Sequence, residues 1–118
     1  IGIFPEGTRS KDGKMAQGKT GVARLAAHTG AAVVPVAIRQ TDGVWLVSKR
    51  VPRPWRKFYY KFGEPIYFGE SEASKENLRE FTDKVMKEIE ILSKECEDYW
   101  ESRKILPRMK KYIKSKLS

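Results

Sequence analysis

The chain has 118 residues and a mass of 13.6 kDa, which suits one domain, or part of one, with a modest core. Its formal net charge of +9 predicts an acidic partner. A single cysteine, Cys96, excludes an internal disulfide and offers no cysteine cluster for a metal. No apolar run approaches the ~20 residues needed to span a bilayer, so we expect any membrane contact of these residues to be peripheral.

The first forty residues predict a strand, a loop, a helix and a second strand. Residues 1–4 are apolar and should end a buried strand, and residues 5–14 should form a loop. Residues 20–27 place small and apolar side chains on one face of a short helix, which Gly30 should stop. Residues 32–38 then predict the second strand.

This order indicates an α/β fold. Strand, helix and strand imply a parallel pair joined by a right-handed crossover. Pro35 cannot donate a hydrogen bond to a ladder, so the second strand should be irregular there or lie at an edge. Ligands of such sheets bind beyond the carboxyl ends of the strands, where residues 4–9 fall.

The remaining chain predicts further strands and one long helix. Residues 44–48 and 58–62 should be strands, and residues 65–68 a short extended piece. Ser74 is a plausible N-cap. After it, large apolar side chains recur at three- and four-residue steps, namely Leu78, Phe81, Val85, Ile89, Leu92 and Cys96. We expect this stripe to pack against the sheet.

The segment Phe4-Pro5-Glu6-Gly7-Thr8-Arg9-Ser10 has the composition of an anion-binding turn. Arg9 can bind a phosphate through two parallel hydrogen bonds, and Gly7 lets the backbone approach a ligand closely. The alternative for Glu6 is a simple ion pair with Arg9.

This segment resembles the third conserved block of the glycerolipid acyltransferases, typified by 1-acylglycerol-3-phosphate (lysophosphatidate) acyltransferase. In that family a polar loop, a small-residue helix and a strand with Val/Ile-Pro-Val follow, and Val34-Pro35-Val36 is the counterpart here. Phe62-Gly63-Glu64-Pro65-Ile66 is similar to a strand that often closes the family's domain. The resemblance covers about residues 1–70, which it identifies as the C-terminal half of an acyltransferase domain. Residues 71–118 would be an amphipathic helix and a basic tail.

The expected fold class is therefore α/β, with a partial acyltransferase-like mixed sheet, flanking helices and a C-terminal amphipathic helix. The resemblance implies acyl transfer from acyl-CoA or acyl carrier protein to the free hydroxyl of lysophosphatidate, giving phosphatidate in phospholipid biosynthesis. It implies no cofactor beyond the thioester co-substrate and no metal. It also implies a membrane-associated enzyme at the cytoplasmic face of an anionic membrane, without a nucleic-acid partner.

The same resemblance assigns roles to single residues. Arg9 would bind the acceptor phosphate, helped by the backbone N–H of Gly7 and the hydroxyl of Thr8. Glu6 would hold a glycerol hydroxyl or fix neighbouring basic side chains, and Pro35 would help to shape the substrate cleft. Lys14 and Lys19 are weaker phosphate candidates.

The chain departs from the family's pattern at the general base. The family uses a His in an Asn-His-x-x-x-x-Asp block upstream of the turn, whereas the only histidine here is His28, with Val33 five positions later. We interpret His28 as a polar residue at the end of the short helix. We therefore expect the chain to be the C-terminal part of a longer enzyme, inactive by itself, or else a non-catalytic lipid-binding relative.

Two other functions fit parts of the sequence. Gly13-Lys14-Met15-Ala16-Gln17-Gly18-Lys19-Thr20 matches the G-x-x-x-x-G-K-T loop of nucleotide hydrolases, but no strand immediately precedes Gly13. Residues 49–61 combine six basic side chains with aromatic ones, which suits an anionic membrane surface or single-stranded nucleic acid. The basic tail after Pro107 predicts either a short membrane-surface helix or a frayed end.

Overall fold

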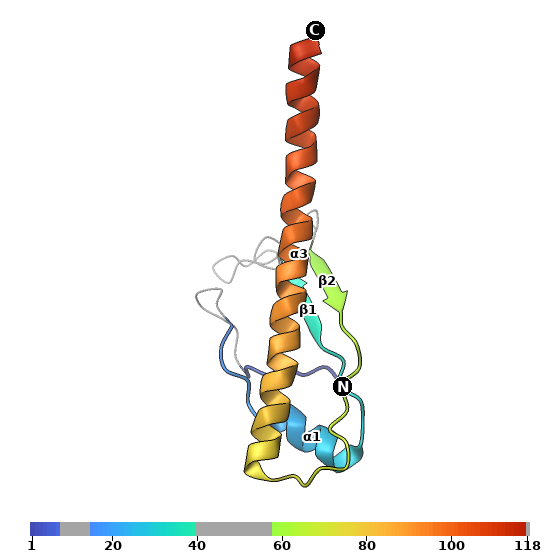
Figure 1. The fold of residues 1–118 in the computed structure, drawn as a ribbon, viewed down its shortest axis with the longest axis vertical. Helices are drawn as coiled ribbons and strands as arrows, with labels where there is room; N and C mark the ends of the chain where they lie inside the picture. The colour runs from blue at the N-terminus through green and yellow to red at the C-terminus, as the bar shows by residue number, and fades with distance from the viewer. Residues whose placement is uncertain (8–14, 40–57, 118) are drawn as a thin grey trace, which may run out of the picture.

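The computed structural model describes residues 1–7, 15–39 and 58–117. Its elements in chain order are α1 (Gly21–Thr29), β1 (Val36–Arg39), β2 (Tyr59–Phe62) and α3 (Lys75–Leu117). The molecule is elongated, with extents of 68 × 34 × 21 Å, because α3 runs the whole length of it (Figure 1). Helix α1 and both strands lie beside the first part of α3, which therefore forms the spine of the fold.

The sheet is an antiparallel pair. β1 and β2 are in register from Val36 opposite Phe62 to Arg39 opposite Tyr59. An isolated bridge between Val33 and Ile66 extends the pairing, with hydrogen bonds of 2.8 Å in both directions. Helices against a small sheet agree with a partial α/β fold.

Pro35 lies between that bridge and β1, where the ladder is interrupted. It has no N–H to donate, so β1 begins one residue later, at Val36. Its carbonyl oxygen still accepts a hydrogen bond of 2.8 Å from the N–H of Gly63. The predicted irregularity of the strand at Pro35 is confirmed.

The predicted parallel pair does not form among the described residues. Residues 1–4 are extended without strand pairing, and β1 takes its hydrogen-bond partner from β2, which follows it in the chain. The mixed sheet therefore stays a prediction. The strand predicted for residues 44–48 lies outside the described residues, and that predicted for residues 58–62 is β2.

Helix α1 follows the sequence closely. It begins at Gly21 and ends at Thr29, and Gly30 adopts a left-handed backbone with a φ of 68°. The N–H of Gly30 donates to the carbonyl of Ala26 at 2.9 Å, the single bond of a left-handed helix end. The buried side chains of α1, Val22, Ala23 and Ala26, face the core.

Helix α3 supplies half of the buried hydrophobic side chains among the described residues. Ser74 Oγ accepts a hydrogen bond of 3.2 Å from the N–H of Asn77, which confirms the predicted N-cap. The predicted stripe is buried against α1 and the sheet, apart from the half-buried Ile89. One cluster gathers around Phe81 and Val85, and a second joins Ala37 of β1 to Leu92 and Cys96. The burial therefore accounts for the stripe without any ligand.

The residues after Pro107 are helical, as one of the two predictions for the tail required, but they do not form a separate short helix. The helix continues through Pro107 to Leu117 instead of restarting after the proline or fraying. Pro107 is exposed, so its ring enters no packed interface. None of the helices formed by the described residues has a stretch apolar enough to cross a membrane.

Candidate functional site

The first part of the predicted anion-binding segment forms a tight turn that ends at Gly7. The N–H of Gly7 donates to the carbonyl of Phe4 at 2.9 Å, which closes the turn over Pro5 and Glu6. Gly7 itself has a φ of 72°, a left-handed conformation that favours glycine. The turn therefore requires the glycine that the sequence places there.

Two hydrogen bonds join the two ends of the loop. The Glu6 carboxylate accepts from the N–H of Ala16 at 2.8 Å, across ten positions of the chain. The carbonyl of Pro5 accepts from the N–H of Lys19 at 2.7 Å. The segment that ends at Gly7 and the segment that begins at Met15 are thus held together. Glu6 has a positioning role that the sequence did not predict, because its partner is a backbone N–H.

The side chain of Lys19 lies directly against Gly7. A Cβ atom on Gly7 would stand 2.9 Å from the Lys19 Nζ and 3.1 Å from its Cε. The ammonium group is exposed, so it can meet an anion as well as cover the glycine. Lys19 was a weak phosphate candidate from sequence, and the structure places its side chain at the turn.

Helix α3 packs against the loop at Gly18. A Cβ on Gly18 would lie 2.7 Å from Met86 Cγ and 3.0 Å from Thr82 Cγ2. Thr82 is fully buried, and its hydroxyl donates to the carbonyl of Leu78 at 2.8 Å. This support was missed in the sequence, where Gly18 looked like part of a nucleotide loop. Its only sequence signal is a glycine close to the start of α1.

The structure brings two of the predicted site residues to one cavity. Glu6 and Pro35 both line a space of about 800 Å³ enclosed by the N-terminal segment, residues 31–38, α1 and α3. Most of its lining is apolar, including Ile3, Val34 and Ile89. Thr8 and Arg9 lie outside the described residues, as does Lys14.

Pro35 reaches this cavity from a packed position. It is less than 2% exposed, and a Cβ on Gly63 would lie 2.8 Å from its Cγ and 2.9 Å from Leu92 Cδ1. Pro35 therefore holds the junction of β1, Gly63 and α3. Its part in substrate binding stays a prediction.

Comparison with known proteins agrees with the turn and the elements around it. The model of a family described as Acyltransferase matches residues 1–39. A chloroplastic 1-acyl-sn-glycerol-3-phosphate acyltransferase of Arabidopsis thaliana is 55% identical over 42 residues, which is 36% of this chain and 12% of the relative. The 1-acyl-sn-glycerol-3-phosphate acyltransferase of Borreliella burgdorferi is 28% identical over 102 residues, covering 78% of this chain and 37% of the relative.

A solved structure extends the likeness to the fold. The crystal structure of the 1-acyl-sn-glycerophosphate acyltransferase of Thermotoga maritima is 33% identical, with a TM-score of 0.51, over 76% of this chain and 38% of that one. These matches support the glycerolipid acyltransferase family for this chain. It spans 12% of the Arabidopsis relative and little more than a third of the two bacterial ones.

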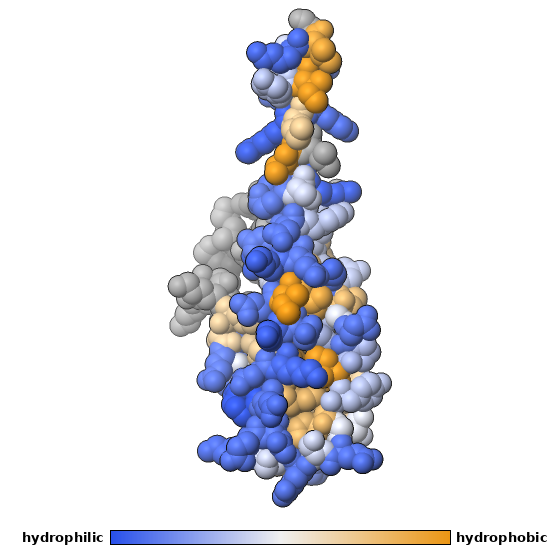
Figure 2. Space-filling view, in the orientation of Figure 1, coloured by the Kyte–Doolittle hydropathy of each residue, from blue (hydrophilic) through white to orange (hydrophobic). Residues whose placement is uncertain are grey.

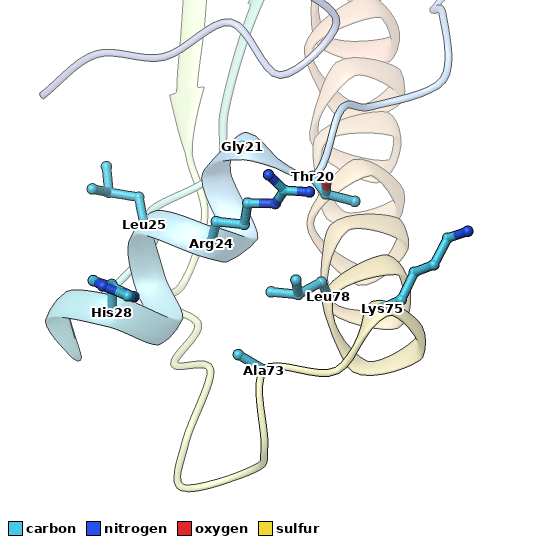
Figure 3. Close-up of a pocket in the computed structure, with 8 residues that line it drawn as sticks. All are labelled: Thr20, Gly21, Arg24, Leu25, His28, Ala73, Lys75 and Leu78. Atoms are coloured by element: carbon cyan, nitrogen blue, oxygen red, sulfur yellow. The ribbon is translucent and has the colours of Figure 1, made fainter.

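The general base expected from the family resemblance is a His paired with an Asp five positions later. His28 does not have this arrangement. It lies exposed in the last turn of α1, as predicted. Figure 3 shows it beside a shallow, mostly apolar cavity of about 780 Å³, with Arg24 on the same helix and Lys75 at the start of α3. The three basic side chains do not converge on one point in this view.

The phosphate loop of a nucleotide hydrolase is not supported by the described part of the match. Gly18 packs against α3, and Lys19 points to Gly7. The segment before the gap, residues 1–7, is an extended stretch and a turn, not a strand that leads into Gly13. Among residues 1–7, 15–39 and 58–117, no three His, Cys, Asp or Glu side chains gather as a metal site requires.

The described end of the basic and aromatic segment belongs to the sheet. Residues 49–57 lie outside the description. Tyr59 packs against Tyr99 and Trp100 of α3, with ring centroids 5.8 and 5.2 Å apart. Lys61 pairs with Glu95, and this hydrogen bond raises the pKa of the Lys61 ammonium above its ordinary value. Both residues are therefore occupied by contacts to α3.

Proposed function

We propose that this chain supplies the acceptor-phosphate site of a 1-acylglycerol-3-phosphate O-acyltransferase in phospholipid biosynthesis. The observation that carries the proposal is the turn at Gly7, whose left-handed backbone is covered by the Lys19 ammonium. A cation held against the backbone of a turn suits a phosphate group. The relatives named as acyltransferases of 1-acyl-sn-glycerol-3-phosphate support the choice of acceptor.

In the proposed reaction the free hydroxyl of lysophosphatidate attacks the thioester carbonyl of acyl-CoA or acyl carrier protein. The new ester C–O bond forms, the C–S bond breaks, and the hydroxyl proton passes to a general base and then to the leaving thiol. Arg9 and Thr8 bind the acceptor phosphate, and Lys19 adds a second positive charge. The N–H of Gly7 does not take the part expected of it, because it donates to the carbonyl of Phe4 within the turn. Binding in this way lowers the barrier by orientation.

Glu6 acts in this proposal through the loop. Its carboxylate is engaged by Ala16, so it holds the ends of the segment that carries Thr8 and Arg9. The base comes from outside these 118 residues, because His28 lacks a partner five positions later and lies exposed on α1. These residues alone should then be inactive, and the reaction takes place at the surface of a membrane.

The test is thiol release from acyl-CoA by the full-length gene product that carries this sequence. Release should depend on lysophosphatidate. Arg9→Ala and Lys19→Ala should each lower kcat/KM for the acceptor by about 10- to 100-fold, the value of a charged hydrogen bond. Lys84→Ala, an exposed lysine on α3, is the matched control and should leave it unchanged. Thiol release that does not respond to lysophosphatidate would overturn the proposal.

A further inference from the structure

The last part of α3 projects beyond the other residues that the structure describes. Figure 1 shows the helix extending past β2 to the C-terminal end. Every described side chain from Ser102 to Leu117 is exposed. At a rise of about 1.5 Å per residue, residues 102–117 form a rod of about 24 Å. We call this segment the projecting helix.

The projecting helix carries an exposed apolar stripe. Ile105, Met109, Tyr112, Ile113 and Leu117 are 53, 53, 64, 48 and 84% exposed. Their spacing of three and four residues puts them on one side of the helix. Figure 2 shows orange side chains running along one side of this end, with blue ones standing out beside them.

The stripe does not continue the buried one. Ile105 follows Cys96 by nine residues, which is two and a half turns at 3.6 residues per turn. It therefore lies on the opposite side of α3 from the side that packs against the sheet. Packing against the other described residues explains the stripe around Val85 but gives no reason for this second one.

The charges on the projecting helix have a single sign. After Glu101 the chain has seven basic side chains and no acidic one, namely Arg103, Lys104, Arg108, Lys110, Lys111, Lys114 and Lys116. Lys114 follows Ile105 by nine residues, which is two and a half turns, so it lies on the opposite side of the helix, and Lys111 lies next to it. A helix with an apolar side and a cationic side has the chemistry of a segment that lies in an anionic bilayer surface.

The charge also argues against a second copy of this chain and against nucleic acid as the partner of the stripe. Two copies of the projecting helix would bring fourteen cations together, because each copy has seven and no acidic side chain to compensate them. Nucleic acid would bind the cations but leave the stripe in water. An anionic lipid surface satisfies both sides at once.

We propose that residues 102–117 dock this protein on an anionic bilayer, with Met109 and Ile113 entering the headgroup region and the lysines meeting lipid phosphates. The docking does not depend on acyl transfer. It would hold the Gly7 turn near a membrane, whatever the turn binds.

The test is co-sedimentation of the full chain with vesicles. Phosphatidylcholine vesicles containing phosphatidylglycerol should bind the chain at least about ten-fold more strongly than phosphatidylcholine alone. The double variant Met109→Glu/Ile113→Glu should lower binding to the anionic vesicles by about ten-fold or more. Lys110→Gln/Lys111→Gln should weaken it too, and added salt should reduce what remains.

Each variant has a matched control on the packed part of α3. Ile91→Glu changes an exposed apolar side chain, 43% exposed, and Lys87→Gln/Lys94→Gln changes two exposed lysines. These variants should bind anionic vesicles as the parent chain does. The substitutions are all at exposed positions, so circular dichroism should show unchanged helix content in water.

Three results would overturn the proposal. The stripe variant could bind anionic vesicles as well as the parent does. The parent could bind a polynucleotide better than the vesicles, with only the lysine variant weakened. Sedimentation without lipid could reveal a dimer that the stripe variant dissociates. Acyl transfer to detergent-dispersed lysophosphatidate should be unaffected by all these variants, so the outcome is separate from that of the proposed reaction.

Discussion

The Glu6 carboxylate lies 2.8 Å from the backbone nitrogen of Ala16 and accepts its hydrogen bond. A charged side chain next to a proposed phosphate site is thus used to close a loop. A carboxylate repels a phosphate, but the Glu6 carboxylate has a structural purpose here because it accepts a hydrogen bond from the backbone. The position of Glu6 decides what its replacement should do.

Replacing Glu6 by Gln should preserve most of the loop, because the amide oxygen can still accept from Ala16. Glu6→Ala should remove the bond, at a cost of about 1 kcal/mol for this exposed pair. Amide hydrogen exchange at Ala16 checks the difference and should be faster in Glu6→Ala alone. Equal losses of kcat/KM in both variants, with exchange unchanged, would instead indicate direct contact of the carboxylate with substrate.

Gly7→Ala should impair the turn for two reasons that can be separated. The φ of 72° costs about 1–2 kcal/mol for a residue with a Cβ, and that Cβ would also meet Lys19. Thermal unfolding of Gly7→Ala, Lys19→Ala and the double variant forms a cycle. The double variant should be less destabilised than the sum of the two, since the clash is absent. Strict additivity would show that Lys19 does not cover Gly7 in solution.

Gly18→Ala should destabilise the chain by about 1–3 kcal/mol, because the new methyl group would overlap Met86 and Thr82. The matched control is Gly21→Ala in the first turn of α1, where no atom lies within 4 Å of the added Cβ. It should be neutral or slightly stabilising. Urea unfolding measures both, and equal stability of the two variants would contradict the packing of the loop on α3.

Glu95→Gln should lower the pKa of Lys61 towards the ordinary value, because the hydrogen bond from Glu95 is what raises it. A raised lysine pKa means that any stabilisation is present below the unfolded pKa of 10.5 and is lost as the pH rises through the folded value. Both side chains are about half exposed, so the stability change should be small. Side-chain NMR titration of Lys61 provides the measurement, and an unchanged pKa would contradict the pairing.

Much of the local structure could be predicted because its causes are local. The stripe from Leu78 to Cys96 repeats at helical spacing, and Ser74 and Gly30 are residue types that favour helix ends. Pro35 interrupts its strand through its own missing N–H. Each of these features depends on residues a few positions apart, which the sequence displays directly.

The features that could not be predicted depend on contacts between distant residues. Val36 pairs with Phe62 in an antiparallel sheet. The residue pattern of each strand predicts a strand but does not specify which other strand pairs with it. The hydrogen bond from Ala16 to Glu6 crosses ten positions of the chain. Its donor is a backbone N–H, which is not specific to a residue type, so the sequence does not single it out. Lys19 gained importance only when its side chain was found against Gly7. The stripe of the projecting helix was visible in the sequence, but its exposure among the described residues was not.

The central claim is that the turn at Gly7 binds the phosphate of the acceptor, and direct binding tests it best. Isothermal titration calorimetry of the full-length protein would compare a short-chain lysophosphatidate, below its micelle concentration, with the monoacylglycerol that lacks the phosphate. The account predicts at least about ten-fold tighter binding of lysophosphatidate, and loss of that preference in Arg9→Ala. The same preference in Arg9→Ala as in the parent protein would contradict it.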